Sequence, residues 1–133
     1  MKTDAKPLTK AQAERLADLV EAAWAVFDKA AASSPPSLRK GPRGGGRDRD
    51  KMIDHVLEAE AAYVRMIGLR HKPPARSDKK AITEARKETL AALRAARQPM
   101  VEQKTKTWPY RYAARRIAWH VLDHAWEMED RRQ

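Results

Sequence analysis

Cysteine is absent from this chain of 133 residues. Disulfide bonds, thiolate metal ligands and a cysteine nucleophile are therefore excluded. Glycine is scarce, with five residues, and β-branched residues are few and scattered. Alanine, leucine, glutamate, lysine and arginine are abundant instead, so the composition favours α-helices over strands.

The chain also lacks an apolar run long enough to span a membrane. Its N-terminal segment, M-K-T-D-A-K-P, is polar and has no apolar core of the kind that secretory signals carry. We therefore expect a soluble, cytoplasmic protein with no membrane partner.

The formal net charge of +10 first suggests a nucleic-acid partner. The excess, however, is spread over three separate stretches, residues 34–52, 65–80 and 94–116. No predicted helix carries a dense basic face, and basic residues do not alternate with aromatic ones. We interpret the charge as a solubility feature and expect no nucleic-acid partner.

Periodic apolar positions predict four helices, at about residues 9–32, 48–68, 78–98 and 109–131. Thr9 and Gln12 have the form of a capping box at the start of the first helix. Asp48 is a plausible N-cap for the second helix, and Gly68 a plausible stop. Four helices of about twenty residues predict an all-α four-helix bundle, formed as a single domain by residues 1–133.

Three of the four histidines can meet inside such a bundle. His120 and His124 are four residues apart, so a helix projects both from the side that carries its apolar residues. His55 lies at the edge of the apolar arc of the second helix. Three neutral imidazoles with an open fourth position form a catalytic zinc site in outline, and other divalent metals accept the same ligands. Metal-free histidines in mutual hydrogen bonds fit the same pattern.

Other polar residues have weaker patterns. Glu60 falls within the apolar arc of the second helix, so we expect a partner such as Arg86 or Arg116, with a catalytic role as the alternative. His71 lies in the proline-containing connection of residues 69–77 and is expected to be solvated. Glu58 and Glu127 follow histidines by three residues but are turned away from the ligand side, which argues against a di-iron site.

The chain resembles the DinB/YfiT-like superfamily of small metal-binding four-helix bundles. The resemblance rests on H-V-L-E-A-E-A-A-Y from His55 and W-H-V-L-D-H-A-W-E-M-E-D-R from Trp119. That family has one histidine on the second helix and His-x-x-x-His on the last, which match His55, His120 and His124. The resemblance implies a divalent metal ion, with zinc or nickel expected. It also implies a thiol S-transferase or hydrolase acting on a small molecule such as a low-molecular-weight thiol.

The resemblance also implies an up-down-down-up helix order. His55 lies about 10 Å from the start of its helix, and the midpoint of the other two histidines about 14 Å from the end of theirs. The ligands are therefore more nearly level if the second and fourth helices run antiparallel. In that order the loop of residues 33–47 overhangs the metal end. Arg43 and Arg47 are candidates to bind an anionic substrate there, although they could equally serve only solubility.

The fourth helix has a second stripe, formed by Tyr112, Trp119, Leu122 and Trp126, on the side away from the histidines. It either contacts a neighbouring helix or forms a homodimer interface through Tyr112, Trp119 and Trp126. The main functional hypothesis is a metal-dependent enzyme with a small-molecule substrate. The alternative is a non-catalytic helical interaction module with structural histidines.

Overall fold

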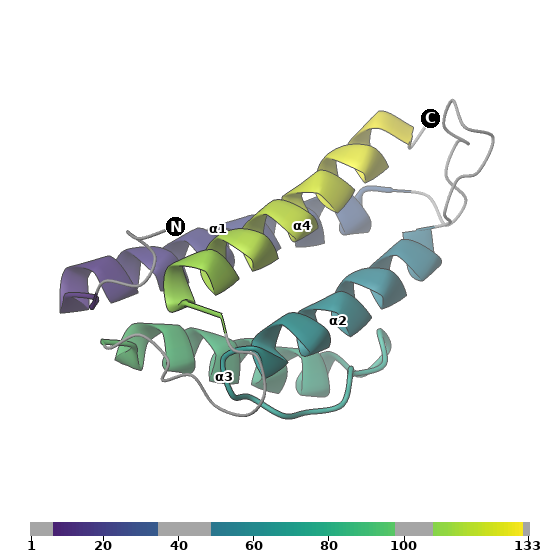
Figure 1. The fold of residues 1–133 in the computed structure, drawn as a ribbon. Helices are drawn as coiled ribbons and strands as arrows, with labels where there is room; N and C mark the ends of the chain where they lie inside the picture. The colour runs from purple at the N-terminus through teal and green to yellow at the C-terminus, as the bar shows by residue number, and fades with distance from the viewer. Residues whose placement is uncertain (1–6, 35–48, 98–107, 132–133) are drawn as a thin grey trace.

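The computed structural model describes residues 7–34, 49–97 and 108–131. These residues form four helices and, within the described ranges, no strand: α1 (Lys10–Ala32), α2 (Arg49–Arg65), α3 (Lys79–Ala95) and α4 (Tyr110–Arg131). Figure 1 shows the four helices gathered into one bundle. The prediction of an all-α four-helix bundle is therefore confirmed. No described helix carries the long apolar stretch that crossing a bilayer requires.

Local sequence explains where the helices begin. The Thr9 hydroxyl accepts a hydrogen bond from the Gln12 backbone N–H at 3.1 Å, and the Gln12 side chain accepts one from the Thr9 N–H at 2.9 Å. This is the capping box predicted for α1. Asp78 caps α3 by accepting a hydrogen bond from the Ala81 N–H at 3.0 Å. Asp48, the expected cap of α2, lies outside the described residues.

Two helices end earlier than their patterns predicted. α2 ends at Arg65, not at 68, and a turn of residues 66–68 follows, in which each backbone N–H donates three residues back. Gly68 then takes a positive φ of 92°, which its missing Cβ allows. α3 ends at Ala95, not at 98, because Ala96 already has an extended backbone.

The directions of the helices follow from contacts between their ends. Arg111, at the start of α4, donates to Gln12 near the start of α1, so these two helices run the same way. α3 is antiparallel to α1, because its late residue Arg94 pairs with the early residue Glu14. The Trp108 N–H donates to the Met66 carbonyl, which joins the start of α4 to the end of α2.

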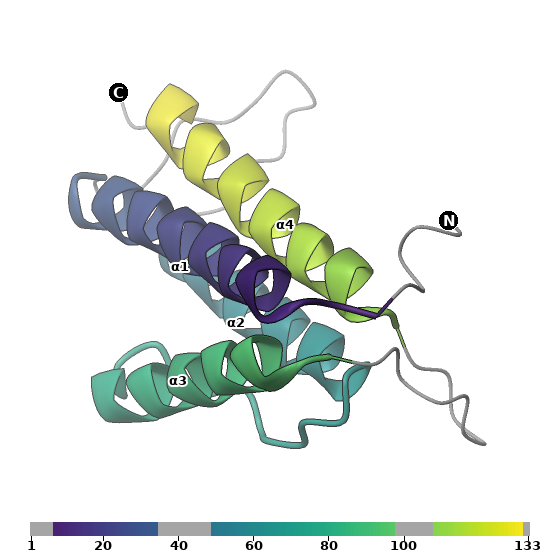
Figure 2. The ribbon, with the colours of Figure 1, turned by 90° about the vertical axis from the view of Figure 1, so that its left-hand side faces the viewer.

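The resulting order is up-down-down-up, and the colour gradient along the chain runs accordingly in both ribbon views (Figures 1 and 2). The connection after α2 returns along the bundle before α3 begins.

The core is centred on the contact of α1 with α4, the most extensive between any two helices. Small side chains are fully buried on both helices, and they allow the two backbones to approach closely. These are Ala13 and Ala17 on α1 and Ala113, Ala114 and Ala125 on α4. α2 has its main contact with α4 alone, and that contact is less extensive. The space between α2 and α4 is where the histidines lie.

Candidate metal centre

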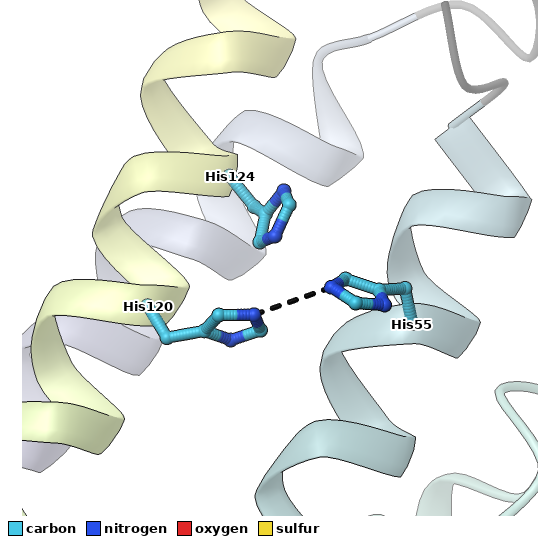
Figure 3. Close-up of side chains that lie close together, drawn as sticks. All are labelled: His55, His120 and His124. Carbon is cyan, nitrogen blue, oxygen red and sulfur yellow. Dashed lines mark hydrogen bonds between the residues drawn. The ribbon is translucent and has the colours of Figure 1, made fainter.

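The three predicted histidines lie together between α2 and α4. His55 comes from the second turn of α2, and His120 and His124 come from successive turns of α4. Figure 3 shows their imidazole rings turned toward one another across the space between the two helices. One nitrogen from each ring lies within 4.8 Å of the others, and the ring centroids are 4.6 to 5.2 Å apart.

One nitrogen–nitrogen distance in the cluster matches the distance between two ligands of one metal ion. His120 Nε2 and His55 Nε2 are 3.3 Å apart. Two imidazole nitrogens that bind one tetrahedral metal at about 2.0–2.1 Å lie roughly 3.4 Å from each other. The same distance suits a hydrogen bond in which one ring donates and the other accepts. The geometry fits a divalent metal without rearrangement of this pair.

Glu127 contacts His124 from the side opposite the cluster. Its Oε1 atom is 3.2 Å from His124 Nδ1, and both side chains are half-buried. A carboxylate can only accept here, so Nδ1 is the donor, and in the neutral ring Nε2 then carries the lone pair. Metal-binding histidines commonly have such a partner, which fixes the tautomer and the ring orientation. The sequence pattern predicts Glu127 only as turned away from the ligand side; its contact with His124 follows from the spacing of three residues on one helix.

The remaining predicted residues lie elsewhere. His71 is not part of the ligand group, as expected, but it is half-buried rather than fully solvated, and its Nδ1 atom lies 3.5 Å from Glu88 Oε2. Arg43 and Arg47, the candidate substrate-binding residues, lie outside the described residues. Glu58 is exposed.

Glu60 is buried as predicted, with 8% of its surface exposed, but its direct partner is different from the expected ones. Its Oε2 atom accepts a hydrogen bond from Trp24 Nε1 at 2.7 Å. Arg86 lies near enough to attract the carboxylate but forms its own bidentate pair with Asp28, at 2.7 and 2.9 Å. Arg116 stacks instead on the ring of Tyr63.

Burial raises the pKa of Glu60 from 4.5 to about 7, against the opposing effects of the Trp24 hydrogen bond and the Arg86 charge. Beside it is a cavity of about 20 Å³, room for one water molecule. The lining of this cavity includes His71 and Thr89 but no residue of the histidine cluster. Glu60 therefore belongs to a separate polar cluster that joins α1, α2 and α3.

The aromatic stripe of α4 faces outward. Trp119 is 56% exposed, Trp126 48% and Tyr112 39%, while Leu122 is half-buried against the core. The two tryptophan rings contact each other edge-on, with their centroids 6.5 Å apart. Packing against a neighbouring helix therefore accounts for Leu122 but not for the tryptophans.

Comparison with known proteins adds nothing to this geometry: no family model, curated protein or solved structure matches the chain. Among the residues that the structure describes, His55, His120 and His124 are the group whose ligand atoms are close enough to hold a metal ion.

Proposed function

We propose that this protein binds a divalent metal ion, zinc or nickel, through His55, His120 and His124. We propose further that it is a DinB/YfiT-like thiol S-transferase or hydrolase with a small-molecule substrate, and that it acts in the cytoplasm. The observation that carries the metal proposal is the convergence of three imidazoles from two helices on one point.

Electrostatics favour a cation at that point. In the neutral His124 ring with Nδ1 donating to Glu127, the Nε2 atom presents a lone pair to the cluster. His55 and His120 also turn Nε2 atoms toward each other. Lone pairs that converge in this way repel one another unless a proton or a cation lies between them, and a divalent ion satisfies three at once.

The ligand set fits catalysis as well as binding. Three neutral imidazoles leave the positive charge of an ion uncompensated and one tetrahedral position open. A metal ion bound there would lower the pKa of a coordinated thiol or water molecule. Glu127 orients His124, and Tyr63 lies edge-on to His120, with ring centroids 5.4 Å apart. All three histidines are half-buried.

The metal content of the purified protein tests the proposal against the alternative, a non-catalytic helical module with hydrogen-bonded histidines. The protein is prepared without a histidine tag and incubated with zinc, nickel or manganese before dialysis. We expect about one metal ion per chain. Less than about 0.1 ion per chain for all three metals would favour the non-catalytic module.

We also propose that the face formed by Tyr112, Trp119 and Trp126 binds a second copy of the chain. Exposed aromatic side chains are enriched at protein interfaces. The first half of α4 carries Arg115 beside this face, and the second half carries Asp123 and Asp130. Two copies that meet with their α4 helices antiparallel place the basic half of each against the acidic half of the other.

A further inference from the structure

An aromatic wall lies beside the histidine cluster, on the side toward the start of α4. Tyr63, from α2, contacts His120 edge-on with ring centroids 5.4 Å apart. The ring centroids of Trp108 and Tyr63 are 5.6 Å apart, and those of Tyr112 and Trp108 are 4.9 Å apart. The rings thus form a continuous row that ends at His120.

A guanidinium group stacks on this wall. The Cζ atom of Arg116 is 5.1 Å from the centroid of the Tyr63 ring. Arg116 precedes His120 by four residues on α4, so the two side chains project from the same face of the helix, one turn apart. The Tyr63 ring is therefore the common neighbour of the guanidinium and of one candidate metal ligand.

Arg116 is available for a ligand. It is exposed, and within the described parts of the chain no carboxylate forms an ion pair with it. By contrast, Arg86 and Arg94 are both held by acidic residues of α1. A guanidinium that is held over an aromatic face by a cation–π contact still has N–H donors that can bind a carboxylate in bidentate fashion.

Two carboxylates near the cluster are already engaged by other side chains. Asp54, which precedes His55 on α2, is paired with Arg76 at 2.8 Å. Glu127 is engaged by His124. A metal with three neutral ligands and a nearby guanidinium together create a positive potential on this side of the site.

We propose that Arg116, held by Tyr63, is the specificity-determining residue that binds the carboxylate of a substrate whose other end ligates the metal. The proposal rests on the proposed metal site. The substrate class is a short molecule in which a few carbon atoms separate a ligating atom from a carboxylate, because His120 and Arg116 are neighbours of the same ring.

The experiment uses the cobalt(II)-loaded protein and two probes that differ only in charge, 3-mercaptopropionate and 3-mercaptopropionamide. Each is titrated while the thiolate-to-cobalt absorption band is recorded. We expect the parent protein to bind the acid about tenfold more tightly than the amide, since a hydrogen bond to a charged group contributes on that scale. Arg116→Gln should abolish this preference and leave the affinity for the amide unchanged.

Arg15→Gln is the matched control. Arg15 is an exposed residue of α1, a helix that contributes no residue to the cluster, and its replacement changes the net charge equally. It should retain the preference for the acid. Thermal unfolding of each variant checks that the fold is intact, and glutamine is a good helix former at both positions.

The outcomes separate the two proposals. If cobalt binds with tetrahedral absorption but Arg116→Gln still prefers the acid, the role of Arg116 is wrong and the metal site stands. If Arg15→Gln loses the preference for the acid to the same extent, the preference depends only on net charge, and the specific role of Arg116 is wrong. If cobalt does not bind to the parent protein, the metal proposal fails and this inference fails with it.

Discussion

At the scale of single residues, His55 is the histidine on which the cluster depends most. It alone comes from α2, while His120 and His124 share α4. We expect His55→Ala to lower zinc affinity at least about 100-fold, because two imidazoles from one helix rarely hold a divalent ion tightly. Competition with a chromophoric chelator measures the affinity, and circular dichroism should show unchanged helix content.

His71→Ala is the control for this experiment. It also removes one histidine, but His71 lies in the connection between α2 and α3, outside the cluster, with its Nδ1 atom 3.5 Å from Glu88 Oε2. The control should bind zinc like the parent protein. If His55→Ala binds zinc as tightly as His71→Ala, the three-histidine site is wrong.

Glu60 makes the stability of the fold depend on pH. Its pKa is about 7 in the folded protein, above its ordinary value of 4.5, because burial disfavours the charged carboxylate. The folded state therefore holds the proton more tightly than the unfolded state. The stabilisation is fully present below pH 4.5 and is lost as the pH rises through about 7. The difference in the free energy of unfolding is on the order of 3 kcal/mol.

Glu60→Gln should remove this dependence while keeping an acceptor for the Trp24 N–H. At pH 8 we expect the variant to be more stable than the parent protein, and at pH 4 the difference should disappear. Urea unfolding between these pH values measures it. Glu58→Gln, an exposed neighbour on the same helix, is the control and should follow the parent protein. If Glu60→Gln also follows it at every pH, Glu60 does not titrate as described.

The position of a side chain could be predicted from the sequence when its partners are close along the chain, and not when they are distant. The facing of His120 and His124 follows from the helical period, a local property, and the burial of Glu60 follows in the same way. The partner of Glu60 is Trp24, which precedes it by 36 residues. That choice depends on the rotation and register of α1 against α2, which no local pattern specifies. Charge alone suggested Arg86 or Arg116.

At the scale of elements, helix starts were easier to predict than helix ends. The capping box of Thr9 and Gln12 is complete within four residues, so the sequence contains all of it. The end of α2 depends on a transition from α-helix to a tighter turn, and the apolar period continues through that turn to the buried Ile67. The period therefore made the predicted helix too long.

Thr9→Ala should lower the free energy of unfolding by about 1 kcal/mol, because it leaves the Gln12 N–H without its side-chain acceptor. Thr83→Ala is the matched control. Thr83 is exposed within α3, so the same change there should be neutral or slightly stabilising through helix propensity. Urea unfolding of both variants gives the comparison. Equal stabilities would mean that the cap contributes nothing to the folded state.

At the scale of the whole molecule, the helix order brings the three histidines to a similar height along the bundle axis. His55 lies near the start of α2, and its partners lie at and just beyond the middle of α4. These positions are more nearly level when the two helices run antiparallel, and the end of α2 accordingly meets the start of α4 at Met66 and Trp108. The long connection between α2 and α3 makes that order possible, since it returns along the bundle.

The same order leaves one face of α4 outside the bundle, and the second copy proposed for that face can be tested by its mass. Tyr112, Trp119 and Trp126 recur every seven residues, so they form one stripe along the helix. We expect sedimentation velocity to show a monomer–dimer equilibrium in the micromolar range. Trp119→Asp should shift it strongly toward the monomer, because it places a charge at the centre of an apolar contact.

Charge reversal tests the antiparallel arrangement itself. With a two-fold axis near Trp119, Arg115 of one copy lies level with Asp123 of the other, since each is four residues from the axis. Asp123→Arg should weaken the dimer, and the added change Arg115→Asp should restore it, because opposite charges face each other again. Ala91→Asp adds a charge to an exposed position of α3 and should leave the dimer unchanged. A sedimentation coefficient that stays monomeric at every concentration, in the parent protein and all variants alike, would show that the exposed tryptophans do not bind a second copy.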